Sequence, residues 1–290
     1  MQPDEPSRTA LIPARHRAAH QTLDHGSILR DPFALKILGE DERDVLRFAN
    51  AHPLVSILRL LTAARSRIAE DALSEAVERG TRQVVILGAG LDTFALRNPH
   101  RAQQIHIYEV DHPATQAWKR QRLADAQLAL PPWLTFAPVD FERDDLANEL
   151  VAAGFQRSAP AFFIWLGVVP YLTQGAIDKT LDFMASIPNA EVAFDYMEPP
   201  EAFSDEMKQL VKARAAQLEK IGEPWASRLE PAVVAAILSS HGFCDIEDID
   251  FQQISSRFGR LVRGLAPGQP GIHVVHAKRE QNCREARVRE

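Results

Sequence analysis

Five short apolar runs, separated by segments with helical spacing, constrain the fold of this chain more than any other feature. After Arg82 the runs are QVVILG, QIHIYEV, LTFAPVD, AFFIWLGVV and AEVAFDYM, and each has the length and composition of a buried strand. Strands that are apolar on both faces and alternate with helices are typical of a parallel sheet that helices cover on both sides. The sequence therefore predicts an α/β fold, a Rossmann-like doubly wound sheet, for residues 81–279.

Helical patterns surround this predicted sheet. Residues 1–80 contain no convincing strand and predict a helical N-terminal cap that contributes to a cofactor and acceptor site. Residues 198–231 are helical and charged, with prolines near both ends, and predict a lid inserted into the sheet domain. CDIEDIDF and GIHVVHAKR predict two last strands, and the second is expected to close the sheet as an edge strand. Residues 280–290 have too few apolar side chains to bury, which predicts a mobile tail.

Composition and charge argue against several classes of protein. The formal net charge is −6 and the basic residues are scattered, so we expect no continuous surface for nucleic acid. No stretch approaches the roughly 18 consecutive apolar residues that cross a bilayer, so no membrane span is expected. Cys244 and Cys283 lack CxxC spacing, which argues against a zinc site or a disulfide framework and favours a cytoplasmic location. His16 and His20 are four residues apart without a further ligand at suitable spacing, so we expect no metal.

A glycine turn follows the first predicted strand, in VVILGAGLDTFALR. Glycine lets the backbone turn sharply and leaves no side chain between the chain and a bound cofactor. Gly88, Ala89 and Gly90 are therefore predicted to touch a ligand. A glycine turn can also merely connect a strand to a helix, so its meaning depends on the residues that follow.

Acidic side chains end the next two predicted strands. The second strand ends with Glu109 and Asp111, and a carboxylate at that edge can accept hydrogen bonds from both ribose hydroxyls of an adenosine. The third strand is followed by Asp140 and Phe141, a carboxylate and an aromatic ring beside the expected position of an adenine. A loop aspartate often serves only as a helix cap, so the weight of Asp140 comes from its order after the other two features.

The residues after the glycine turn help to distinguish cofactors. Nicotinamide and flavin enzymes also use GxG with a downstream acid, but their fingerprint continues to a third glycine. Here Asp92 and Thr93 stand at that point, and an aspartate beneath a helix N-terminus disfavours an incoming pyrophosphate. A sulfonium cofactor carries no phosphate and tolerates the aspartate. A nicotinamide-dependent oxidoreductase is the alternative.

Four segments, taken in order, resemble a known family. LGAGLDTFALR, YEVDHPATQAWKR, APVDFERDDLANELVAAGF and WLGVVPYLT are similar to the leucine carboxyl methyltransferase family, particularly its bacterial members of unassigned substrate. The resemblance covers roughly residues 8–280. It implies a class I methyltransferase domain that uses S-adenosylmethionine as its cofactor.

The resemblance also implies roles for individual residues. Members bind the methionyl carboxylate with an arginine in the helix before the first strand; Arg65 stands at that place, with Arg67 two residues on. The implied cofactor contacts are Arg65, Gly88, Ala89, Gly90, Glu109, Asp111, Asp140, Phe141 and, at the end of the fourth strand, Leu166. Leu166 is a departure, because members directed at protein phosphatase have a glutamate there. A lysine of the family, about 11 residues before Asp31-Pro32, is matched by His20, with Arg17 one turn earlier.

These features together predict an O-methyltransferase that acts on a carboxylate or hydroxyl of a small-molecule acceptor, with secondary metabolism as one setting. Tyr171 follows the fourth strand and is predicted to orient the acceptor by donating a hydrogen bond; Tyr196 is expected at the same edge. A cofactor-binding protein without transferase activity is a further alternative, because Leu166 removes one polar contact. Monomer and homodimer stay open.

Overall fold

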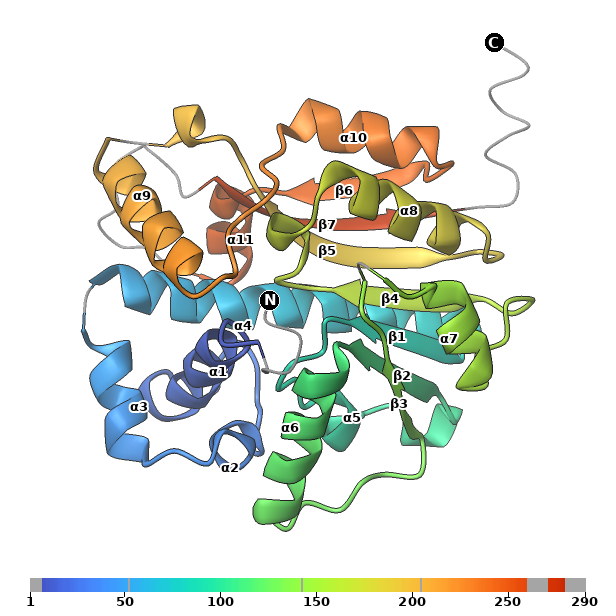
Figure 1. Ribbon diagram of the computed structural model, residues 1–290, viewed down its shortest axis with the longest axis horizontal. Coiled ribbons are helices and arrows are strands. Elements are labelled where there is room, and N and C mark those ends of the chain that lie inside the picture. The colour runs from blue at the N-terminus through green and yellow to red at the C-terminus, as the bar shows by residue number, and fades with distance from the viewer. Residues whose placement is uncertain (1–6, 52, 142, 204, 260–270, 280–290) are drawn as a thin grey trace.

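A seven-stranded sheet forms the centre of the computed structural model, which describes residues 7–51, 53–141, 143–203, 205–259 and 271–279. The strand order is β3-β2-β1-β4-β5-β7-β6 (Figure 1). The strands are β1 (Gln83–Leu87), β2 (His106–Asp111), β3 (Leu134–Pro138), β4 (Ala161–Trp165), β5 (Glu191–Met197), β6 (Asp245–Ile249) and β7 (Ile272–Lys278). The first five pair in parallel, which confirms the predicted Rossmann-like doubly wound sheet.

β7 runs antiparallel to the other six strands, and the order of the two last strands differs from the expected one. β7 pairs with β5 on one side and with β6 on the other, so β6 is the edge strand. The expectation that the last strand closes the sheet is therefore wrong. Burial explains the order, because the interior of β7 is buried throughout, whereas the acids of DIEDI in β6 leave that strand partly exposed.

Helices cover both faces of the sheet. One face packs against α7 (Leu146–Ala152), α8 (Gln174–Ala185) and α10 (Pro231–Ser240). The opposite face packs against the second half of α4 (Pro53–Glu78) and against α5 (Phe94–Arg97). α6 (Pro113–Asp125) follows β2, and α11 (Phe251–Arg257) follows β6. Three short 3-10 helices lie in loops: η1 (Arg101–Gln103), η2 (Val169–Tyr171) and η3 (Pro200–Ala202).

The N-terminal segment and the segment after β5 are helical. The first contains α1 (Leu11–Leu23), α2 (Ala34–Leu38) and α3 (Glu42–Ala49) before α4, and the second contains α9 (Asp205–Lys220). Figure 1 shows α1, α3 and α9 on the same side of the molecule, near the first half of α4. The predicted tail, residues 280–290, lies outside the described residues.

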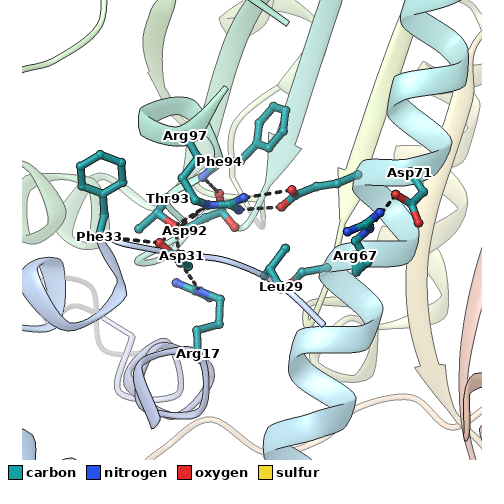
Figure 2. A network of polar contacts seen from close by, with 12 residues as sticks. Arg17, Leu29, Asp31, Phe33, Arg67, Asp71, Asp92, Thr93, Phe94 and Arg97 are labelled. Carbon is teal, nitrogen blue, oxygen red and sulfur yellow. Dashed lines mark hydrogen bonds and ion pairs between the residues drawn. The ribbon is translucent and has the colours of Figure 1, made fainter. Parts of the chain in front are cut away.

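A buried polar network joins the N-terminal helices to the glycine turn (Figure 2). Asp31 is 1% exposed and accepts a hydrogen bond from the Thr93 hydroxyl at 2.6 Å. Its carboxylate also lies 3.4 Å from Nε of Arg17 and 3.7 Å from Nε of Arg97. Arg17 in turn donates to the carbonyl oxygen of Leu91 at 2.5 Å. The loop after α1 is therefore fixed directly against the residues that follow the glycines.

Cys244, between α10 and β6, is disulfide-bonded, so the sequence-based argument against a disulfide is wrong for this residue. Spacing along the chain does not reveal which cysteines meet in space. Cys283 lies outside the described residues. The cytoplasmic location loses the support of cysteine usage and stays a prediction.

None of the described helices combines the length and the apolar character that crossing a bilayer requires. Within the same residues, no group of three or more His, Cys, Asp or Glu side chains could hold a metal ion.

Candidate functional site

A large cavity lies at the carboxyl ends of β1, β2, β4 and β5, where ligands bind in open α/β sheets. Its volume is about 970 Å³, and α1, α4, α9 and the loops after the strands supply its walls. Nine of the ten sequence-predicted site residues line it: Arg65, Gly88, Ala89, Gly90, Asp111, Asp140, Phe141, Leu166 and Tyr171. Glu109 is the exception.

The glycine turn forms the floor of this cavity. Gly88 has φ +63° and Gly90 has φ +46°, a backbone conformation that residues with a side chain rarely adopt. The amide of Ala89 donates to the carbonyl of Val110 at 3.0 Å, which ties the turn to β2. A Cβ at position 88 would collide with the Val168 side chain, so both the conformation and the space require glycine there.

Gly88→Ala is expected to weaken both folding and ligand binding, because alanine meets a left-handed backbone and a collision with Val168 together. The left-handed conformation alone costs about 1–2 kcal/mol. Gly175→Ala is the matched control, since a Cβ there meets nothing within 4 Å and the residue lies in the first turn of α8. Thermal unfolding and S-adenosylhomocysteine titration of both variants measure the effect. Equal melting temperatures for the two variants would contradict the expectation.

Asp111 lies at the end of β2 with its carboxylate turned towards the glycine turn. One oxygen accepts a hydrogen bond from the Gly90 amide at 2.6 Å, and the other accepts one from the amide of the next residue, His112, at 2.7 Å. Burial raises the pKa of Asp111, while these two amides act in the opposite direction. A carboxylate has about four acceptor positions, so two backbone bonds leave capacity for the hydroxyls of a ribose.

Glu109, two residues earlier in β2, occupies a different environment. It is 1% exposed, and its carboxylate receives a hydrogen bond from Nζ of Lys119, on α6, at 2.5 Å. Burial raises the pKa of Glu109 to about 7 in spite of that ammonium. The side chain does not line the cavity, so its predicted role in cofactor binding has no geometric support. It joins β2 to α6 instead.

Asp140 and Phe141 reach the cavity from the loop after β3. The amide of Asp140 donates to the Asp144 carboxylate at 2.8 Å, which holds the loop in a tight turn. Nε2 of His112 lies 3.9 Å from the Asp140 carboxylate. An acid and an aromatic ring therefore stand beside Asp111, where an adenine attached to a bound ribose would lie.

Arg65 approaches the opposite side of the cavity from α4. Its Nη1 donates to Asp195 at 2.6 Å, and the second oxygen of Asp195 accepts the Gly167 amide at 2.5 Å. The Nε of Arg65 is enclosed and has no hydrogen-bond partner in the described structure. A fixed guanidinium with an unused donor can hold a carboxylate.

Leu166 and Tyr171 line the cavity from the segment after β4. The Leu166 side chain contributes apolar surface to the cavity wall. Tyr171 lies in η2, where burial raises the pKa of its phenol and its hydroxyl contacts the side chains of Trp225 and Thr9. The phenol is therefore un-ionised at neutral pH and can donate a hydrogen bond.

Sequence reasoning missed Asp195 and misplaced Tyr196. Successive side chains of a strand point to opposite faces, so only one of these neighbours in β5 can meet Arg65. The Tyr196 hydroxyl instead donates to Asp248, on β6, at 2.6 Å, and the residue does not line the cavity. The sequence does contain a signal for Asp195, because an aspartate directly after the apolar run AEVAF lies near the end of a strand.

Of the two residues matched to the family's lysine, Arg17 is the one that reaches the cavity. Arg17 lines the cavity, whereas His20 is fully buried and bonded to Asp24 at 2.9 Å. Both residues lie on α1, one turn apart. The face of α1 that carries Arg17 meets the glycine turn, because Arg17 contacts the carbonyl of Leu91.

The arrangement fits an adenosyl cofactor with a charged amino-acid end. A glycine turn and a carboxylate with spare acceptor positions stand at one end, and a guanidinium with an enclosed, unpaired Nε stands at the other. In proteins such an enclosed polar atom usually has a partner, so a ligand carboxylate would complete it. These are the groups that a ribose and an α-carboxylate require.

Comparisons with known proteins agree with the geometry. A model of the family described as "Leucine carboxyl methyltransferase" matches residues 10–185, more than half of the chain. The Bacillus subtilis protein named "Putative S-adenosyl-L-methionine-dependent methyltransferase YktD" is 29% identical over 96% of this chain and 99% of that protein. A Mycobacterium bovis protein named "Putative S-adenosyl-L-methionine-dependent methyltransferase" is 30% identical over 70% of this chain and 69% of its own length.

A solved structure extends the agreement to the fold. The crystal structure of "a putative methyltransferase" from Thermobifida fusca superposes with a TM-score of 0.58 and 18% identity, covering 96% of this chain and 97% of that one. Fold, family model and relatives thus define an S-adenosylmethionine-dependent methyltransferase of class I. The chain belongs to the leucine carboxyl methyltransferase family.

Proposed function

We propose that this enzyme methylates an oxygen atom of a small-molecule acceptor, a carboxylate in preference to a hydroxyl. The observation that carries the proposal is that Arg65 and Asp111 line the same cavity, whose other walls are mostly apolar. The N-terminal segment, residues 1–80, would act as a cap and residues 198–231 as a lid over the acceptor. An acceptor with an apolar body would displace water from such walls favourably.

The cofactor would be held at both ends. Arg65 would bind its methionyl carboxylate, Asp111 would accept from its ribose hydroxyls, and Asp140 with Phe141 would flank its adenine. Gly88, Ala89 and Gly90 would meet it through backbone atoms, with Leu166 as an apolar wall. When bound, the cofactor would supply an electrophilic methyl group, carried on its sulfonium, for the acceptor oxygen.

The contribution of the protein is mainly orientation. Tyr171 would donate a hydrogen bond that directs the acceptor, and the walls would exclude water from the reacting atoms. An in-line displacement gains most of its acceleration from such positioning, because reacting atoms must approach within about 3–3.5 Å in line. A carboxylate is already ionised at neutral pH and therefore needs no base.

The histidines of the cavity favour a carboxylate rather than a hydroxyl as the group that accepts the methyl. Among the described residues, His16 and His112 line it. Burial, assisted by nearby arginine charges, lowers the pKa of His16 to about 3. So weak a base takes a proton from a hydroxyl inefficiently. The Nδ1 of His112 accepts the amide of Ala114 at 3.3 Å and caps α6, beside Asp140 rather than beside Tyr171.

Calorimetry followed by a transfer assay tests the proposal. We expect saturable binding of S-adenosylhomocysteine and none of NADH, and then transfer of a labelled methyl group to members of a carboxylic acid panel. Alcohols and phenols of matched size form the comparison panel. Binding of NADH alone would indicate an oxidoreductase. Cofactor binding without transfer to either panel would indicate a binding protein that lacks transferase activity.

A further inference from the structure

Among the described residues, four arginines line the cavity, and they differ in their partners. Arg17 lies 3.4 Å from Asp31, Arg65 lies 2.6 Å from Asp195, and Arg143 lies 3.7 Å from Asp140. These three charges are each matched by a carboxylate of the protein.

Arg214, on α9, is the fourth. Within the described parts of the chain no carboxylate lies within 4 Å of its guanidinium, whose Nη1 donates instead to the neutral Gln217 amide oxygen at 2.8 Å. The side chain is only half-buried, yet the cavity that it lines is largely apolar, and Phe203 and Val211 are among the other lining residues. A cation beside apolar walls gains more from an anionic ligand than a fully solvated one does.

The charge of Arg214 acts on two other residues of the cavity. It helps to lower the pKa of His16, on α1, and it opposes the rise in the pKa of Tyr171, in η2. The guanidinium therefore lies near both residues, which line the same cavity, and Arg65, whose charge lowers the pKa of His16 more strongly than that of Arg214 does, also lies near His16. Tyr171 is the residue proposed to orient the acceptor, so Arg214 belongs to the acceptor side.

His16 offers a neutral donor at the same place. It is 3% exposed, and its Nδ1 is enclosed without a hydrogen-bond partner. A neutral imidazole carries one N–H donor, and His16 lines the cavity, so that N–H can meet a ligand there.

We propose that Arg214 and His16 form an acceptor-recognition subsite, which binds an anionic group of the acceptor and selects acidic molecules with an apolar body. The inference rests on the proposed function, since it needs an acceptor in this cavity. Arg214 would supply the charge and His16 a neutral N–H bond. Because Arg214 is on α9, the acceptor would also join the lid to α1.

Ligand binding to the cofactor-saturated enzyme tests the subsite. The probes are octanoate and 3-phenylpropionate, each compared with its own neutral amide, in the presence of saturating S-adenosylhomocysteine. We expect the wild type to bind each acid at least about tenfold more tightly than the amide, as charge-assisted hydrogen bonds require. In Arg214→Gln this preference should fall to about one, and His16→Phe should reduce it in the same direction.

Lys212→Gln is the matched control, because Lys212 is an exposed cation on the same helix and does not line the cavity. It should keep the full preference for the acid. Binding of S-adenosylhomocysteine should change less than about twofold in Arg214→Gln, which separates loss of the subsite from loss of the fold.

Three results would overturn the subsite. These are a wild type that binds the acids no better than the amides or does not bind them, an unchanged preference in Arg214→Gln, and an equal loss in Lys212→Gln. Failure of the proposed function looks different, because it shows in the transfer assay: the wild type would then bind S-adenosylhomocysteine but transfer no methyl group to the carboxylic acid panel.

Discussion

Arg65→Ala is expected to raise the Kd for S-adenosylhomocysteine by about 100-fold or more. Two effects add. The first is that the ligand carboxylate loses its charge-assisted hydrogen bonds with the guanidinium, each of which contributes about 1.5–3 kcal/mol. The second is that the Asp195 side chain, which is only 8% exposed, loses its counterion and would lie beside the space that the Arg65 guanidinium has left. Its negative charge would then repel an incoming carboxylate. Isothermal titration calorimetry at fixed ionic strength measures the change.

Two controls give this prediction its specificity. Arg67→Ala removes an arginine two residues away on α4, where it pairs with Asp71 on the surface at 2.7 Å, and should leave the Kd within about twofold. 5′-Methylthioadenosine lacks the amino-acid end, so its affinity should be nearly the same in Arg65→Ala and the wild type. If Arg65→Ala weakens both ligands equally, the residue acts on the fold rather than on the methionyl carboxylate.

The strands and the glycine turn could be predicted from the sequence because their signals are local. A run such as QVVILG that is apolar on both faces requires a buried strand, and glycines with φ above zero follow where the chain must turn. The order of the last two strands could not be predicted in that way. It depends on which of them is buried on both sides, and both carry enough apolar residues to form a strand.

The site could be predicted only in part, because partners far apart in the sequence decide how a side chain points. Glu109 and Asp111 are two residues apart in β2, but Lys119 holds the first under α6 while backbone amides hold the second at the cavity. Asp195 was missed for the same reason, since its role depends on Arg65, 130 residues earlier. Such ion pairs leave no periodic trace in a sequence.

The Asp31 network predicts a large effect on stability. Asp31→Ala is expected to lower the free energy of unfolding by about 3–5 kcal/mol, because it leaves the buried Arg17 without its carboxylate. The Thr93 hydroxyl loses its acceptor as well, and Arg97 retains its ion pair with Glu70 at 2.6 Å and its hydrogen bond to the Thr93 hydroxyl at 3.3 Å. Urea unfolding measures the loss, provided that the dependence of the free energy of unfolding on urea concentration (the m value) is the same in the variant and the wild type.

Asp71→Ala provides the comparison for Asp31→Ala, since Asp71 pairs with Arg67 at the surface in the same region of the molecule (Figure 2). An exposed ion pair contributes about 0–1 kcal/mol, so this variant should unfold almost as the wild type does. Saturating S-adenosylhomocysteine should restore part of the stability lost in Asp31→Ala, because the ligand binds only the folded chain. Equal losses in the two variants would mean that Asp31 does not join the N-terminal helices to the glycine turn energetically, whatever its contacts. The glycine turn would then be held by β1 and β2 alone.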